Sequence, residues 1–274
     1  STMRWAWRVR NFVRKHRPRR RLAAILSGRR NRMSDVRAAL APAMVERGAN
    51  PAVVIVAFTG GGEKLMMPVY EFFDTTKALG YSRILLCDQY HRRYHDGIDS
   101  ERPDFPSLVR YLKEEIARLG AATVMCIGTS SGGYAAIRAG HELGADYVHA
   151  FAPQTGPIDA RHRSRLWKRP LDIVDLRRLL EKSNGRTIYY IHYGRGCARD
   201  LAYAELLFDS PRVAALGYPS DTHLIAVYLA KKGFLAKSLA VENQNGIVEL
   251  AAAHFSDALE INGSIDGGRA AAAG

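Results

Sequence analysis

A short glycine-flanked turn between an apolar run and a helix-forming run constrains this chain more than any other feature. Residues 128–132 read Gly-Thr-Ser-Ser-Gly and directly follow the apolar run 124–127. In this strand–turn–helix context a serine stands on a strained turn at the carboxyl end of a strand, with its hydroxyl exposed. The positions two before and two after such a serine come too close to other backbone for side chains. Gly128 and Gly132 meet that requirement around Ser130, which is therefore the candidate nucleophile.

Strand-like and helix-like runs alternate through the rest of the chain. Run 52–58 is apolar throughout and rich in β-branched residues, as expected for a strand buried on both faces. The expected strands are 52–58, 83–87, 123–127, 147–152, 187–192 and 212–217, and the expected helices are 69–79, 105–119, 132–143, 171–182, 201–207 and 223–239. Alternation at this spacing predicts an α/β fold, with a mostly parallel sheet and helices on both faces.

The chain is expected to have three parts. Residues 1–47 form a basic N-terminal extension that is partly helical, with a second helical stretch over 34–47. Residues 48–240 form the α/β domain, which carries a basic insertion near 156–185 in the position of a lid. Residues 241–274 form a C-terminal tail, in which a helix is one reading of the first half.

The net charge of +13 belongs almost entirely to the N-terminal extension. Residues 1–37 hold 13 of the 40 Lys and Arg residues and one of the 27 acidic residues, so the remainder is nearly neutral. No specific nucleic-acid partner is therefore expected for the domain. Residues 1–21 combine arginines with tryptophan at helical spacing, which is compatible with contact to an anionic membrane surface. A helix packed on the domain and a solvated arm are the alternatives.

Cysteine content and apolar runs indicate the compartment. The three cysteines include no CxxC pair, which fits a reducing environment and argues against a disulfide scaffold. No apolar run reaches 18 residues, and no apolar core of a secretory signal follows the N-terminal arginines. The expected location is cytoplasmic, with membrane association through the N-terminus as an option.

A serine hydroxyl is a poor nucleophile at neutral pH, so it needs a base. In folds of this kind an acid and then a histidine follow the serine, each after a later strand. His223 follows strand 212–217 and is the candidate base for Ser130, while Asp200 follows strand 187–192 and is the candidate orienting acid.

Three other residues compete for these roles. Asp221 is too near His223 in sequence to orient it comfortably, and Asp209 lies beyond the next helix. His192 lies inside a strand and is predicted to be a core histidine or a supporting one.

Backbone N–H groups are needed to stabilise the oxyanion of an acyl-transfer intermediate. The residue after the nucleophile supplies one, which here is Ser131. The glycine run after strand 52–58 supplies the other, from Gly60 or Gly61. An ordinary tight turn is the competing explanation of that run.

These residues resemble the α/β-hydrolase superfamily over about 51–240. A narrower resemblance, to hydrolase-like domains found beside bacterial glycosyltransferases and surface-polysaccharide genes, depends on four segments: Phe58-Thr-Gly-Gly, Ile127-Gly-Thr-Ser-Ser-Gly-Gly-Tyr-Ala-Ala, Phe151-Ala-Pro-Gln-Thr and Lys232-Gly-Phe-Leu. That branch often has methionine after the serine, where this chain has Ser131. The resemblance implies a serine hydrolase or another acyl-handling protein.

The sequence therefore predicts hydrolysis of an ester or thioester through an acyl-enzyme on Ser130, with a small-molecule or saccharide ester as substrate. No cofactor or metal is required, and His91, His95 and Asp96 lack a further spaced ligand. Three alternatives stay open: a turn that binds phosphate, acyl transfer to an acceptor other than water, and a binding or assembly module without catalysis.

Overall fold

The computed structural model describes residues 42–156, 173–182 and 185–264. The chain divides into two units, 1–42 and 43–274, and the described part of the second is built around one eight-stranded sheet. Residues 1–21, most of the predicted lid at 156–185, and the glycine- and alanine-rich stretch 267–274 lie outside the described residues.

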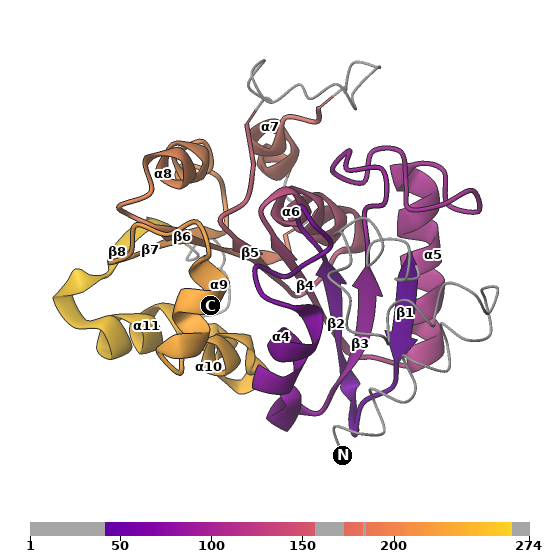
Figure 1. Cartoon of the computed structure of the whole chain (residues 1–274), viewed down its shortest axis with the longest axis horizontal. Helices are drawn as coiled ribbons and strands as arrows, with labels where there is room; N and C mark the ends of the chain where they lie inside the picture. Colours follow the sequence, from indigo (N-terminus) through magenta and orange to yellow (C-terminus); the bar gives the residue numbers. More distant parts are fainter. Residues whose placement is uncertain (1–41, 157–172, 183–184, 265–274) are drawn as a thin grey trace, which may run out of the picture. The chain divides into compact units, whose positions relative to one another are not determined.

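The sheet has six parallel strands at its centre and one antiparallel strand at each edge (Figure 1). The spatial order is β1-β3-β2-β4-β5-β6-β7-β8. The strands are β1 (Ala43–Glu46), β2 (Asn50–Phe58), β3 (Tyr81–Leu86), β4 (Thr123–Thr129), β5 (Tyr147–Phe151), β6 (Ile188–Gly194), β7 (Val213–Tyr218) and β8 (Glu260–Ser264). The predicted α/β class with a mostly parallel sheet is confirmed.

The sheet extends past the limits expected for the domain at both ends. Residues Ala43–Glu46 form a strand paired with β3, not the end of a helix, and Glu260–Ser264 pair with β7. The limits of 48 and 240 are therefore too narrow. Edge strands need only a few backbone hydrogen bonds to a neighbour, so neither segment requires the apolar run that reveals a central strand.

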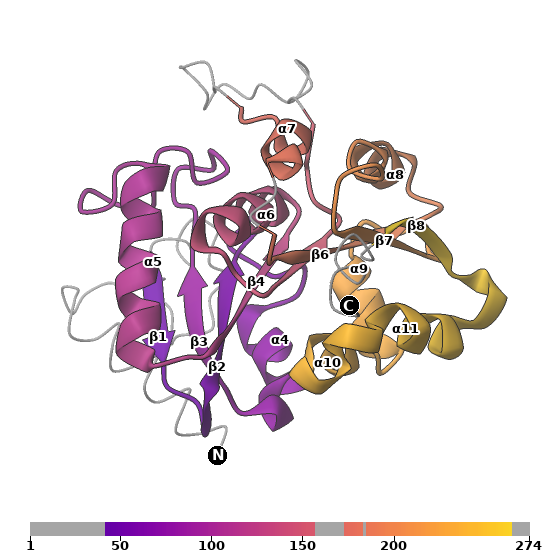
Figure 2. The ribbon, with the colours of Figure 1, turned by 180° about the vertical axis from the view of Figure 1, so that it is seen from behind.

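Helices cover both faces of the sheet, as two apolar clusters show. One face is covered by α5 (Phe105–Leu119), α6 (Ser131–Leu143), α7 (Leu176–Glu181) and α8 (Ala198–Glu205). The other is covered by α4 (Val69–Thr75), α9 (Ile225–Lys231), α10 (Leu235–Leu239) and α11 (Ile247–Phe255), as the view from behind also shows (Figure 2). Short 3-10 helices occur at η1 (Lys77–Leu79), η3 (Val241–Gly246) and η4 (Ser256–Ala258). Alternate residues of β2 enter the two clusters, which explains its unbroken apolar run.

Helices begin and end at capping residues and glycines where the sequence contains them. Helix α5 matches its predicted bounds because the Asp104 and Ser107 side chains form a capping box and Gly120 ends the helix in the left-handed conformation. The helix expected over 223–239 is instead two helices, α9 and α10, separated where Gly233 has a φ of +68°. Within the described ranges no helix is long and apolar enough to cross a membrane.

Candidate active site

Ser130 occupies a strained turn between β4 and α6. Its φ of 53° and ψ of −117° are unusual for a residue with a side chain. A Cβ on Gly128 would lie 2.1 Å from the carbonyl oxygen of Gly132, and a Cβ on Gly132 would lie 2.2 Å from that of Phe58. The two flanking glycines are therefore required by close backbone approach, which is the reason that the sequence pattern predicts.

Backbone hydrogen bonds hold this turn in place. The Ser130 N–H donates to the carbonyl oxygen of Phe151, at 2.9 Å, at the end of the neighbouring strand β5. The Ser130 carbonyl accepts from the N–H groups of Gly133 and Gln154, each at 3.0 Å. Bonds to both sides of the serine stabilise a conformation that would otherwise relax.

The structure brings the three predicted side chains together. Nε2 of His223 lies 3.2 Å from Oγ of Ser130, and Nδ1 lies 2.9 Å from each carboxylate oxygen of Asp200. The Asp200 side chain is fully buried and that of His223 is 27% exposed. Asp200 belongs to the first turn of α8, whereas the sequence places it in the preceding loop. The arrangement can pass a proton from the serine to the histidine.

The loops that carry the acid and the base are bonded to each other. Where the β6–β7 pairing ends, the Arg195 N–H donates to the carbonyl of Tyr218 at 3.0 Å, and the Gly196 N–H donates to that of Ser220 at 2.9 Å. These bonds continue the sheet ladder into the two loops. They fix the entry of α8, and with it Asp200, relative to the segment that leads to His223.

The competing residues lie elsewhere. Asp221 and Asp209 are exposed. His192 is fully buried within β6, as a core or supporting histidine should be. Within the described ranges no group of three or more His, Cys, Asp or Glu side chains is arranged to hold a metal.

The predicted oxyanion donors differ in availability. Ser131 is the first residue of α6, where N–H groups have no partner within the helix. The Gly60 N–H is already bonded to the carbonyl of Lys64 at 2.8 Å, which disfavours Gly60 as a donor. A Cβ on Gly60 would lie 2.6 Å from the carbonyl oxygen of Thr129, so this glycine lets its loop approach the nucleophile. Gly61 is exposed, and a Cβ there would meet nothing within 4 Å.

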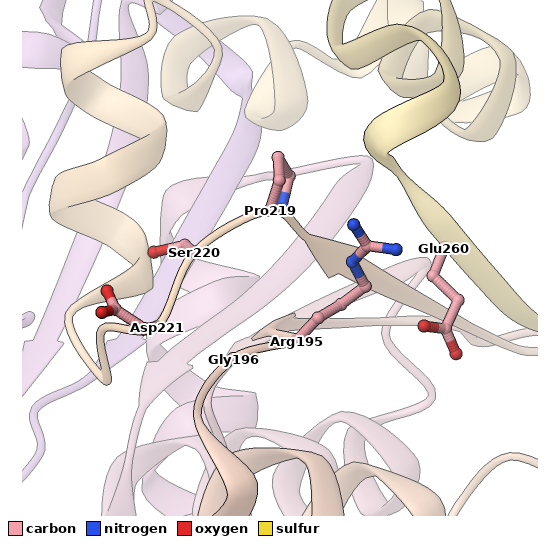
Figure 3. A pocket seen from close by; sticks show the side chains of 6 residues that line it. All are labelled: Arg195, Gly196, Pro219, Ser220, Asp221 and Glu260. Atoms are coloured by element: carbon pink, nitrogen blue, oxygen red, sulfur yellow. The ribbon is translucent and has the colours of Figure 1, made fainter.

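A cavity of about 580 Å³ lies beside the loop that carries His223 (Figure 3). Its lining residues come from the same two loops and from β8: Arg195, Gly196, Pro219, Ser220, Asp221 and Glu260. None of Ser130, His223 and Asp200 lines it. The cavity therefore borders the site and is not its centre.

A fully buried chain of polar side chains lies at the base of these loops. It links Tyr218 of β7, His192 of β6, His149 of β5 and Gln244 of η3 through contacts of 2.9, 3.0 and 2.8 Å. Burial lowers the pKa of His149 to about 4 and holds the pKa of His192 well below its usual value, so both rings are neutral at physiological pH. We call these four residues the buried polar chain. Sequence reasoning missed it as a unit, although two histidines within otherwise apolar strands were a visible signal.

Comparison with solved structures identifies the fold. The chain is similar to an esterase domain from a Rhodothermus marinus protein (16% identity, 74% of this chain and 92% of that one, TM-score 0.51). It is also similar to MPT51 (FbpC1) of Mycobacterium tuberculosis (13% identity, 76% and 92%, TM-score 0.51). A third similar structure is an α/β serine hydrolase homologue from Coxiella burnetii (11% identity, 72% and 91%, TM-score 0.46). No family model and no curated protein matches the sequence.

These similarities and the sheet order assign the chain to the α/β-hydrolase fold, as the sequence predicted. The narrower resemblance, to domains beside polysaccharide genes, stays a prediction.

Proposed function

We propose that this protein is a serine hydrolase that cleaves an ester or thioester through an acyl-enzyme on Ser130. One observation carries the proposal. The hydroxyl of Ser130, the imidazole of His223 and the buried carboxylate of Asp200 form a continuous hydrogen-bonded series at the carboxyl end of the sheet. A strained serine, a histidine and a buried acid in this series are the parts that acyl transfer needs.

The chemistry follows from the contacts. The Asp200 carboxylate accepts a hydrogen bond from the N–H at Nδ1 of His223, which leaves Nε2 as the acceptor facing Ser130. Oγ attacks the substrate carbonyl as Nε2 takes its proton, and the imidazolium then gives that proton to the departing alkoxide or thiolate. Water attacks the acyl-enzyme in the same way, with His223 as base, and releases the acid and free Ser130.

The developing oxyanion needs two donors, and the site offers two candidates. The Ser131 N–H at the start of α6 is one, and the Gly61 N–H in the loop after β2 is the other. Backbone donors aimed where charge develops contribute most when they are held fixed before the reaction. The bonds that anchor Gly60 and Ser130 support that arrangement.

The substrate class follows from the same reasoning. Small-molecule esters fit the likeness to an esterase domain. Removal of an acyl group from a saccharide fits the narrower sequence resemblance and is part of the proposal. Contact of residues 1–21 with an anionic membrane stays a prediction.

Labelling with a fluorophosphonate tests the proposal directly. We expect the full chain to react at Ser130, Ser130→Ala to be unreactive, and His223→Ala to lose labelling. Ser131→Ala is the matched control, because it removes the adjacent hydroxyl and keeps the N–H, so it should label like the wild type. A folded wild-type protein that does not label would favour a binding module. Analysis of products from an acetyl ester, with and without an alcohol, separates hydrolysis from acyl transfer.

A further inference from the structure

The hydrogen atoms of the buried polar chain can be assigned from its fixed end. The side-chain N–H groups of Gln244 donate to the carbonyls of Ser238 and Ala240 at 2.8 and 3.0 Å. Its Oε1 therefore faces Nε2 of His149, which must carry a hydrogen to donate to it. The other amide orientation would set Oε1 of Gln244 against the carbonyl oxygens of Ser238 and Ala240, so that buried acceptors would face one another with no hydrogen between them.

The remaining hydrogens follow in order. Because Nε2 of neutral His149 holds the hydrogen, its Nδ1 accepts one from Nε2 of His192. Nδ1 of His192 is then an acceptor, and the Tyr218 hydroxyl donates to it at 2.9 Å. Every bond thus runs in one direction, from Tyr218 through both histidines to Gln244. All four residues are fully buried, so no water competes for these groups.

His192 contacts the supports of all three members of the candidate site. Its carbonyl accepts the N–H of Ala152 at 2.7 Å, and its ring stacks on Phe151 with centroids 4.7 Å apart. Phe151 is the residue whose carbonyl holds the Ser130 turn. His192 also lies two residues before the end of β6, the strand that leads to Asp200.

Tyr218 completes the connection on the histidine side. It is the last residue of β7, and its hydroxyl bond to His192 fixes the point from which the His223 loop departs. Its backbone carbonyl also accepts the Arg195 N–H, so the same residue anchors the neighbouring loop. A small displacement there moves Nε2 of His223 relative to Ser130, and displacements of about 1 Å reduce rates by roughly a hundredfold.

We propose that His192 and Tyr218 are positioning residues, whose mutual hydrogen bond sets the distance between His223 and Ser130. The inference deepens the proposed function and rests on it for its kinetic readout. Neither residue touches the reacting atoms, and both act through the backbone that carries them.

A matched pair of variants isolates this bond. His192→Asn places an amide oxygen close to the position of Nδ1, while His192→Leu has nearly the same shape and no acceptor. Both lose the link to His149, and they differ in the polar amide, whose oxygen can accept the Tyr218 hydroxyl while its NH2 group takes a buried position that leucine fills with a methyl group. We expect the Leu variant to be labelled by fluorophosphonate roughly tenfold more slowly than the Asn variant, as expected for a misplaced base. Equal rates in the two variants would overturn the proposal.

A second pair removes the hydroxyl instead of its acceptor. Tyr218→Phe is compared with Tyr193→Phe. Tyr193 is also buried, but it belongs to the apolar cluster on the other face of the sheet, and its hydroxyl accepts a hydrogen bond from Asn262. Only Tyr218→Phe should slow labelling and change the pH at which the labelling rate is half of its maximum. If neither the rate nor that pH changes in Tyr218→Phe, the proposal is contradicted.

An NMR measurement that does not depend on catalytic activity separates this inference from the proposed function. The Nδ1 proton of His223 should give a downfield NMR signal while its bond to Asp200 protects it from exchange. The signal should persist in the wild type and His192→Asn, and broaden in His192→Leu and Tyr218→Phe. If the wild type does not label, the proposed function fails and this signal alone decides the positioning role. An identical signal in all four proteins refutes that role.

Discussion

Nδ1 of His223 lies 2.9 Å from both carboxylate oxygens of Asp200. The contact places the ring hydrogen on Nδ1 and leaves the lone pair of Nε2 towards Ser130. Because the Asp200 side chain is fully buried, its charge is little screened by water and acts strongly on the imidazole, although Nε of Arg199 also lies 3.5 Å from Oδ1. Asp200 therefore determines which nitrogen faces the nucleophile.

Asp200→Asn should reduce fluorophosphonate labelling by about 10³- to 10⁴-fold, because an amide can donate to Nδ1 and favours the wrong tautomer. The fold should be retained, since the shape is unchanged. Labelling rates at several pH values check this. Asp221→Asn is the control, an exposed acid two residues from His223, and similar losses in both variants would argue against Asp200 as the orienting acid.

Gly132→Ala should destabilise the domain by about 3 kcal/mol, because the new methyl would lie 2.2 Å from the Phe58 carbonyl oxygen and backbone must move. Urea unfolding measures the change. Gly61→Ala is the matched control, since a Cβ there meets nothing within 4 Å. A Gly132→Ala protein as stable as Gly61→Ala would show that the turn is not closely packed.

Buried His149 should make stability depend on pH. Its pKa is about 4 in the folded protein against 6.5 for an ordinary histidine. The unfolded chain therefore binds more protons between these values, and stability falls as pH falls through that window. The contribution is about 3 kcal/mol between pH 7 and pH 4.

Asp88 acts in the opposite direction, because burial raises its pKa to about 6 and the folded state then gains protons first. The testable quantity is therefore the stability gap between wild type and His149→Gln. This gap should narrow by about 3 kcal/mol from pH 7 to pH 4 in urea unfolding. A gap independent of pH would mean that His149 is not buried as a neutral ring.

Asp104→Ala should cost about 1 kcal/mol of stability, because the carboxylate accepts the Ser107 N–H at the start of α5. Thermal unfolding measures it. Labelling of Ser130 should not change, since no member of the candidate site lies on this helix. Loss of labelling at temperatures where the variant is folded would contradict that separation.

The architecture was predictable where each strand is buried on both faces. The apolar run of β2 and the capped helix α5 carry local signals, and both match their predicted positions closely. The strands β1 and β8 carry none, because four or five residues at a sheet edge are selected by their partner's register. Gly233, which lies inside an amphipathic stretch, indicates in the sequence that the helix breaks between α9 and α10.

The candidate site was predictable in residue type and order, and less so in its supports. A serine between close-packed glycines has a strict local pattern, and an acid and a histidine after later strands follow from the fold. The bond from the Gly60 N–H to the Lys64 carbonyl depends on the backbone path of one loop, and the buried polar chain depends on which side chains neighbouring strands bring together. No spacing along the sequence encodes such pairings.

The pairing of β8 with β7 has a consequence for biosynthesis. Until residues 260–264 have been translated and have paired, β7, the strand that leads to His223, is hydrogen-bonded on one side only, to β6. The pairing that completes the ladder of β7, and so supports the His223 loop, therefore forms only after residues 260–264 have been translated. We expect Ser130 to become reactive only once β8 has docked, because the strand that leads to His223 is paired on both sides only then.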